Sequence, residues 1–195
     1  MSKAIMLSIR PKWVEKIASG EKTIEVRKTR PKLDTPFKCY IYCTLPKYPH
    51  EDFIATNYPM PQFYGGGKVV GEFTCDRIYE ICKRGIPENF DYCYLSLNEW
   101  GNDDIETKIK AISASCVSKE ELNAYGAKAP LLYGWHISDL LIYDQPRELT
   151  AFRRACKNSW YCESCAMYWE NNGTCGNESL QIRRPPQSWC YVEEG

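Results

Sequence analysis

The sequence of 195 residues contains no run of 18 apolar residues and only two histidines. The first absence leaves no candidate for a membrane span. Residues 1–11 also lack the apolar core and small-residue cleavage site of a secretory signal, so we expect a cytoplasmic protein with no membrane partner. A hydrophobic content of 44% argues against a disordered chain. The length suits one well-buried domain, with room for a small appendage.

The chain also lacks net charge, because 25 basic residues balance 25 acidic ones. This balance argues against a wholly basic protein that coats nucleic acid. The charge is nevertheless uneven, since residues 1–32 carry nine Lys or Arg and three Glu, a local balance of +6. Such a segment suits local contact with phosphate. A solvated basic face is the alternative interpretation.

The first 28 residues predict a strand, a helix and a second strand. Residues 3–10 form the first strand, Pro11 opens the helix and Gly20 ends it. The second strand covers about residues 22–28. Its alternation places Lys22, Ile24 and Val26 on one face of the strand. The polar side chains of Thr23, Glu25 and Arg27 lie on the other face. The polar face is a plausible wall of a binding cleft.

The rest of the chain predicts several strands and few helices. A capping box at Ser118 and Glu121 starts a helix. Gly71 marks a bulge or bend in a long strand. The remaining expected elements are strands over 37–44, 68–81 and 131–143, the last bent or paired, with a surface loop over 46–67. The fold class is therefore α+β, with a mixed sheet that curls into a small β-barrel.

Four blocks of sequence, taken in order, resemble the ASCH family of the PUA-like superfold. They are residues 7–17, 20–27, 67–73 and 133–137, within a match over about 3–145. The resemblance implies a PUA-like small mixed β-barrel with flanking helices and a cleft for RNA or a modified nucleobase. Longer relatives of this type resemble proteins of phages and mobile elements.

One ASCH branch hydrolyses acetylated cytidine with a lysine and a threonine on this turn and strand, together with a later glutamate. Lys22 matches the lysine, whereas Glu25 stands where that branch has its threonine. Glu120 or Glu121 would be the later acid. A carboxylate does not replace a hydroxyl that lysine activates. The glutamate at position 25 therefore argues against this hydrolytic activity. If the protein is an enzyme, Lys22 and Glu25 are its working pair.

The residue types themselves predict roles in ligand binding. Arg10, Lys12, Lys22 and Arg27 can hold phosphate or a base carbonyl, and Glu25 can accept from an exocyclic amine. Trp13, Tyr64 or Trp135 could stack on a base.

Each of these assignments has a structural alternative. Glu25 and Arg27, two apart on one strand face, could simply pair. Trp13 and Trp135 could belong to the core, and His136 could be a hydrogen-bonded structural residue.

Eleven cysteines fall into two groups. Six are scattered among apolar residues and are expected to be inert: Cys39, Cys43, Cys75, Cys82, Cys93 and Cys116. The others crowd the end of the chain, where Cys162 and Cys165 form a C-x₂-C pair, followed by Cys175 and Cys190, with Cys156 as a substitute. Four thiolates predict a closed structural zinc site. An iron–sulfur cluster takes the same ligands, and free cysteines or disulfides are the further alternative.

A metal would supply folding energy that the polar residues 156–195 lack. We therefore divide the chain into a barrel domain over 1–147 and a Cys-rich, metal-stapled extension over 148–195 that docks on the barrel. The sequence as a whole predicts a nucleic-acid-binding protein that recognises RNA, single-stranded nucleic acid or a modified nucleoside. The alternatives are an amidohydrolase acting on a modified nucleoside and a protein-interaction module whose partner the sequence does not name.

Overall fold

A computed structural model describes residues 3–48, 50–54, 63–84, 93–97, 112–154, 156, 164–172 and 175–193. The larger of its two main sheets has five strands in the order β10-β6-β3-β1-β11. β1 and β3 are parallel and the other neighbours are antiparallel, so the sheet is mixed as predicted. The bounds are β1 Lys3–Ile9, β3 Phe37–Cys43, β6 Lys68–Cys75, β10 Ser138–Glu148 and β11 Trp189–Glu193.

The second sheet is antiparallel and has the order β2-β9-β7-β8. Its strands are β2 Ile24–Arg27, β7 Ile78–Arg84, β8 Cys93–Leu97 and β9 Leu131–His136. Along the described strands the chain passes between these two sheets four times: from β1 to β2, from β2 to β3, from β6 to β7 through residues 76–77, and from β9 to β10 through Ile137. The strand expected over 68–81 is therefore two strands, one in each sheet, and so is the segment over 131–143.

Alternation along β1 produces two hydrophobic cores, one on each face of the larger sheet. Ile5, Leu7 and Ile9 are buried in a core with α1, Phe37 and Trp135. Ala4 and Met6 point to the other face, where Leu149, Phe152, Ile182 and Val192 cover the sheet. Residues beyond 148 thus complete the second core, and β11 lies antiparallel to β1 at the edge of the sheet.

The predicted closure into a barrel is wrong, because the described strands form two open sheets. The backbones of β2 and β11 do not pair at the seam between the sheets. Side chains bridge this seam instead: Arg27 of β2 donates to the carbonyl oxygen of Ser188, and the Trp189 indole donates to Thr29. A side-chain bridge holds the two edges farther apart than a β-ladder would.

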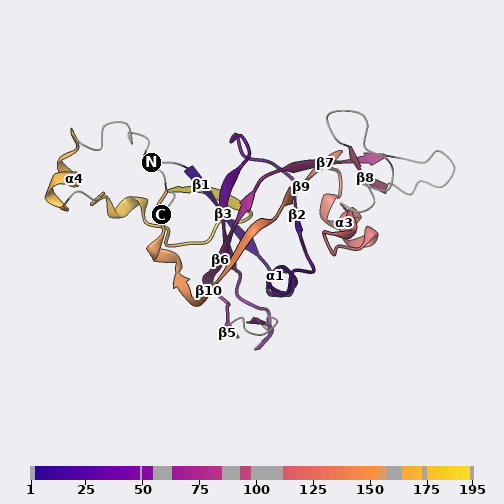
Figure 1. Cartoon of the computed structure of the whole chain (residues 1–195), viewed down its shortest axis with the longest axis horizontal. Helices are drawn as coiled ribbons and strands as arrows, with labels where there is room; N and C mark the ends of the chain where they lie inside the picture. The colour runs from indigo at the N-terminus through magenta and orange to yellow at the C-terminus, as the bar shows by residue number, and fades with distance from the viewer. Residues whose placement is uncertain are drawn as a thin grey trace.

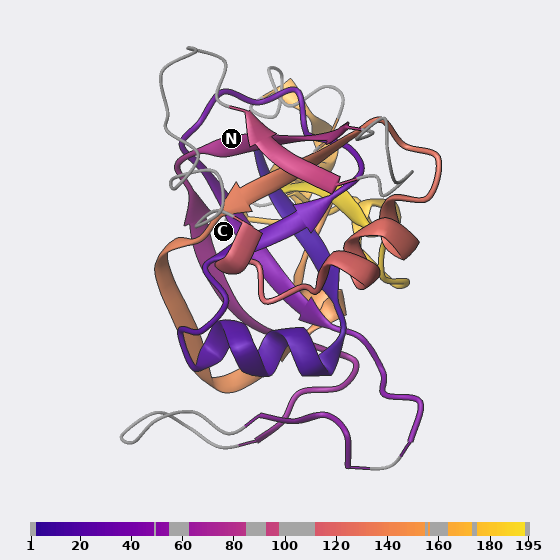
Figure 2. The ribbon, with the colours of Figure 1, turned by 90° about the vertical axis from the view of Figure 1, so that its right-hand side faces the viewer.

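The helices α1 and α3 lie beside this seam. α1 (Pro11–Ala18) begins at Pro11 as predicted, and Gly20 follows it with a φ of +80°. α3 (Lys119–Gly126) begins with the predicted capping box, in which Ser118 and Glu121 exchange hydrogen bonds. Figure 2 shows indigo α1 below and salmon α3 to the right on the side facing the viewer. The described helices include none long and apolar enough to cross a membrane.

Smaller elements surround the two sheets. The loop expected over 46–67 contains a short hairpin, β4 (Phe53–Ile54) and β5 (Phe63–Tyr64). Gly71 lies at a register shift between β3 and β6, which confirms the predicted bulge. The end of the chain adds α4 (Ala166–Glu170) and two 3₁₀ turns, η1 (Leu149–Ala151) and η3 (Glu178–Leu180). α4 lies at the opposite end of the molecule from α3 and β8 (Figure 1).

Candidate functional site

A cavity of about 840 Å³ opens at the seam between β2 and the segment that leads into β11. Its walls come from five stretches of chain: the end of β1 with the start of α1, the strand β2 with the turn before it, Thr44 after β3, the helix α3, and the residues before β11. This volume is typical of a small-molecule site. The charged and aromatic lining residues are Arg10, Lys12, Trp13, Lys22, Glu25, Arg27, Lys28, Glu121 and Tyr125.

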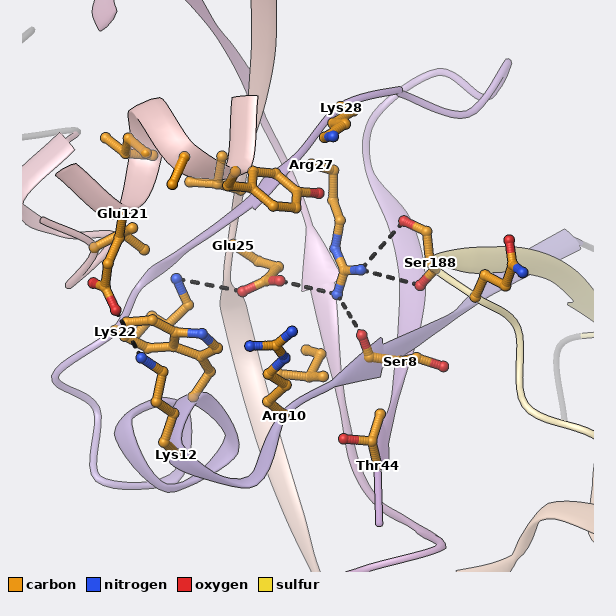
Figure 3. A pocket seen from close by; sticks show the side chains of 18 of the residues that line it. Ser8, Arg10, Lys12, Lys22, Glu25, Arg27, Lys28, Thr44, Glu121 and Ser188 are labelled. Carbon is orange, nitrogen blue, oxygen red and sulfur yellow. Dashed lines mark hydrogen bonds and ion pairs between the residues drawn. The ribbon is translucent and has the colours of Figure 1, made fainter. Parts of the chain in front are cut away.

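Three charged side chains are buried in one wall of the cavity. Lys22 is 2% exposed, and Glu25 and Arg27 are each 6% exposed. One carboxylate oxygen of Glu25 lies 3.3 Å from the Lys22 ammonium, and the other lies 2.9 Å from the Arg27 guanidinium. Figure 3 shows the three side chains pointing toward one another, with Glu25 in the middle. The pairing expected of Glu25 and Arg27 is present, and it includes Lys22.

The Lys22 ammonium is held by three acceptors. It donates to the carbonyl oxygens of Ile24 at 2.7 Å and Ser115 at 2.6 Å, and Glu25 is the third neighbour. An ammonium has three N–H donors and no acceptor. The predicted alternation placed Lys22 on the face opposite Glu25, and this is wrong because β2 begins only at Ile24. Lys22 precedes the strand and reaches Glu25 from the turn.

The segment before α3 holds this turn in place. The Thr23 and Ile24 amides both donate to the carbonyl oxygen of Ala114, at 3.0 and 3.2 Å. Ser115 is fully buried, and its hydroxyl donates to the carbonyl oxygen of Ile112. A backbone carbonyl 93 residues away in sequence therefore helps to position the Lys22 ammonium.

Arg27 joins β2 to both β1 and the end of the chain. One terminal nitrogen donates to the Ser188 carbonyl at 3.1 Å and the Ser188 hydroxyl at 3.3 Å, and the other donates to the Ser8 carbonyl at 2.9 Å. The remaining donor, Nε, is buried and has no hydrogen-bond partner within the described structure. An unpaired buried donor costs free energy unless a ligand or water accepts from it.

A basic and aromatic rim surrounds this wall. The Lys12 ammonium lies 4.1 Å from the centre of the Trp13 ring, and Lys22 lies 5.2 Å from the same ring. Lys12 also pairs with Glu121 of α3 at 2.7 Å. The hydrogen bond from Lys12 and that from the Ser118 amide hold the pKa of Glu121 below its ordinary value. A bridge from α1 to α3 thus crosses the rim.

Lys28 and Tyr125 form the opposite side of the rim. The Lys28 ammonium lies 5.1 Å from the centre of the Tyr125 ring. Burial, and to a smaller extent the Glu25 carboxylate, raises the pKa of Tyr125, while Arg27 opposes the shift. Tyr125 stays a phenol at neutral pH, with a hydroxyl that can donate or accept. Tyr125 is 39% exposed.

Two of the predicted stacking residues lie elsewhere. Trp135 is fully buried, contacts Phe37 edge-on with ring centres 5.7 Å apart, and does not line the cavity. The expectation that it meets a base is corrected, because its side chain on β9 faces the core between the sheets. Tyr64 is 55% exposed on β5, away from the cavity lining. Among the predicted stacking residues, Trp13 alone lines the cavity.

Arg10, Lys12, Trp13, Lys22, Glu25 and Arg27 all line the same cavity. Ser188, Tyr125 and Lys28 also line it and were not predicted from the sequence. Ser188 is 161 residues from Arg27, and no local pattern connects them. His136 lies outside the cavity, where its Nδ1 is 2.6 Å from Asp76.

The predicted metal ligands are only partly described. Cys162 lies outside the described residues, so the predicted set of four cannot be compared as a whole. Cys165 is exposed, whereas Cys156, Cys175 and Cys190 are half-buried. Among the described side chains, no three of the His, Cys, Asp and Glu type form a metal-binding group. The zinc site, and the iron–sulfur alternative, stay predictions from the sequence.

Comparison with protein-family models gives no match for this chain, and comparison with curated proteins gives none. Among solved structures, the chain is similar to the crystal structure of ASCH from Zymomonas mobilis, at 14% identity and a TM-score of 0.47, over 98% of this chain and 88% of that one. Two single-substitution variants of that protein are similar at 14% identity and a TM-score of 0.46, over 99% and 98% of this chain and 92% and 89% of theirs. A likeness at this level carries over no ligand and no residue role.

Proposed function

We propose that the cavity binds a nucleobase of single-stranded nucleic acid, with RNA or a modified base as its ligand. The observation that carries the proposal is the buried Lys22, Glu25 and Arg27 array in the wall of a positively charged, aromatic-rimmed cavity. Burying charges costs free energy that folding alone seldom recovers. A ligand-binding role gives a reason for keeping them beside an open cavity.

The charge of the lining favours an anionic ligand. Five basic side chains line the cavity, together with the two carboxylates of Glu25 and Glu121. The excess of positive charge suits the phosphates that flank a base in a nucleic-acid strand. Trp13 and Tyr125 offer the aromatic faces on which unpaired bases stack.

The buried wall offers hydrogen-bonding groups that suit the edge of a base. Each carboxylate oxygen of Glu25 is engaged by one cation, which leaves further lone pairs able to accept from an amino group. The buried Nε of Arg27 beside it is a further donor, without a hydrogen-bond partner among the described residues. A nucleobase edge carries such a donor and acceptor side by side.

The contacts of Lys22 favour binding over hydrolysis. A lysine that activates a nucleophile must first lose a proton to gain a lone pair. Here two carbonyl oxygens and a carboxylate surround the Lys22 nitrogen, so its N–H groups are engaged by the wall itself. We therefore assign Lys22 the role of fixing Glu25 in the wall, and we propose a reader of nucleic acid.

The proposal is tested by fluorescence anisotropy with labelled single-stranded RNA and DNA over a series of salt concentrations. Arg27→Lys keeps the charge and removes Nε and the planar fork, so we expect about tenfold weaker binding. Lys3→Ala is the matched control, because Lys3 is exposed at the far end of β1 from Ser8. Absence of saturable binding by the wild-type protein at low salt would refute the proposal, as would equal losses in Arg27→Lys and Lys3→Ala.

A further inference from the structure

The strand β2 lies at the edge of its sheet, and its open edge faces the cavity. β9 pairs with one side of β2, and no described strand pairs with the other side. The consecutive residues 25–28 all line the cavity, and Figure 3 labels Glu25, Arg27 and Lys28 around it. Because successive side chains of a strand point to opposite faces, a cavity that contacts all four residues lies along the edge of the strand.

The ladder with β9 decides which backbone groups of β2 point toward this edge. In an antiparallel pair of strands, only every second residue exchanges hydrogen bonds with its neighbour. Ile24 does not bond to β9, because its amide donates to the Ala114 carbonyl and its carbonyl accepts from the Lys22 ammonium. Residues 25 and 27 therefore make the ladder bonds, and the N–H and C=O of Val26 point away from β9 as those of Ile24 do.

The outward backbone groups of Val26 are left without a partner. Val26 is buried against Leu122 of α3, yet neither its N–H nor its C=O is hydrogen-bonded within the described part of the chain. Buried backbone groups are nearly always paired. The next outward amide, that of Lys28, faces Tyr125: burial raises the pKa of this phenol, and the Lys28 amide opposes the shift. One donor and one acceptor thus lie side by side at the cavity, between two positions that are already in contact.

A single open residue suits a small planar group better than an added strand. An extended peptide that joined β2 would bond to residues 24, 26 and 28 in turn. The chain's own contacts already engage residue 24 on one side and approach residue 28 on the other. The edge of a nucleobase carries one acceptor next to one donor, which matches the N–H and C=O of a single residue.

We propose that the backbone of Val26 holds the edge of the bound base. Its N–H donates to a ring nitrogen or carbonyl oxygen of the base, and its C=O accepts from the adjacent amino or imino group. This inference rests on the proposed function and deepens it by naming the groups that bind the base. Since every nucleobase carries such a pair, these contacts hold a base without selecting among the four, and selection is left to side chains such as Glu25.

Amide hydrogen exchange followed by NMR on the full chain tests this directly. The probes are short homopolymeric single-stranded RNAs, one for each base. In the free protein, the Val26 amide should exchange at least about tenfold faster than the Arg27 amide, which bonds within the ladder. The RNA that binds most tightly should slow exchange at Val26 at least about tenfold, and slow it more than at Arg27, which is the internal control.

A pair of variants separates the N–H of Val26 from its side chain. Val26→Pro removes the N–H and keeps the ladder, because proline is accepted on an edge strand where the N–H points away from the neighbour. Val26→Ala keeps the N–H and also loses packing against Leu122, so it is the matched control. We expect RNA affinity to fall about tenfold in Val26→Pro and less than about twofold in Val26→Ala. Thermal melts show whether each variant is folded, and the exchange measurement on the wild type does not depend on them.

The outcomes distinguish this inference from the proposed function. Slower exchange at Val26 on RNA binding, with affinity lost in Val26→Pro and kept in Val26→Ala, supports the backbone contact. Saturable RNA binding that leaves exchange at Val26 unchanged overturns the contact and leaves base recognition standing. Equal losses of affinity in two folded variants also overturn it, because packing would then explain both. Absence of binding to all four RNAs by the wild-type protein overturns both proposals.

Discussion

The Arg27 guanidinium donates to both the carbonyl oxygen and the hydroxyl of Ser188, at 3.1 and 3.3 Å, across 161 residues of sequence. This contact makes the end of the chain a wall of the cavity. The same segment is fixed to β1, because the Ser8 amide donates to the Ser188 carbonyl and the Ser8 hydroxyl donates to the Pro186 carbonyl. The site therefore depends on β11, the last strand along the chain, and on the segment that leads into it.

Removing residues 186–195 should abolish RNA binding, whereas Ser188→Ala should weaken it only a few-fold. The alanine variant keeps the backbone carbonyl as an acceptor for Arg27, and a single neutral hydrogen bond contributes about 1 kcal/mol. The deletion removes both acceptors and the β11 ladder. Anisotropy measurements on samples shown to be folded by circular dichroism check this. Ser188→Ala as damaging as the deletion would contradict it.

Glu25→Gln should lower the free energy of unfolding by about 3 kcal/mol, because two buried cations lose their shared carboxylate. Urea denaturation measures the change. Glu21→Gln is the matched control: it removes an exposed carboxylate that pairs with Lys16, and solvent screening leaves such exposed pairs with little effect on stability. Similar losses in the two variants would show that the buried array does not stabilise the fold.

Glu121 should contribute stability that depends on pH. Its pKa in the folded chain is lowered, first by the Lys12 hydrogen bond and then by the Ser118 amide. Its contribution is therefore present above the ordinary pKa of a glutamate and disappears as the pH falls through the lower, folded-state pKa. We expect the Tm difference between wild type and Glu121→Gln to shrink on acidification. A difference that stays constant from pH 7 to about pH 3 would contradict this.

Three buried thiols of the larger sheet, those of Cys39, Cys43 and Cys75, should resist alkylation in the native state. Burial raises the pKa of Cys43 and Cys75 to about 12 and that of Cys39 well above its ordinary value. The thiolate is the reactive form, so little of it exists at pH 8. Mass spectrometry after iodoacetamide treatment should find exposed Cys165 modified and these three unmodified until the chain is unfolded. Native modification of Cys75 would oppose this assignment.

The predicted zinc site can be tested by metal analysis of the purified protein. If the four cysteines of the sequence motif bind one ion, the protein should hold one zinc per chain, and Cys162→Ser should lose it. Cys116→Ser is the control, since Cys116 lies near the Glu21 carbonyl and outside the motif. A protein purified without chelator that contains no zinc, iron or other metal would refute the prediction.

The sequence by itself determined the local elements and most of the charged site. The helix start at Pro11, the Ser118 capping box and the first strand depend on neighbouring residues, so they could be predicted. Glu25 and Arg27 share a strand face for the same reason. The position of Lys22 in the turn before β2 could not be predicted in this way. Contacts with the distant residues Ala114 and Ser115 fix where the turn ends and the strand begins.

The tertiary structure alone decided that the strands form two separate sheets and which residues meet at the seam between them. Residues 76–77 divide an apparently continuous strand between two sheets, and the seam between β2 and β11 is closed by Arg27 and Trp189 side chains. Ser188 reaches Arg27 only because β11 pairs with β1. Trp135 was assigned to the site from its residue type, whereas packing between the sheets buries it. Contacts between distant segments carry no local sequence pattern, so the shape of the cavity emerges only when the whole chain is folded.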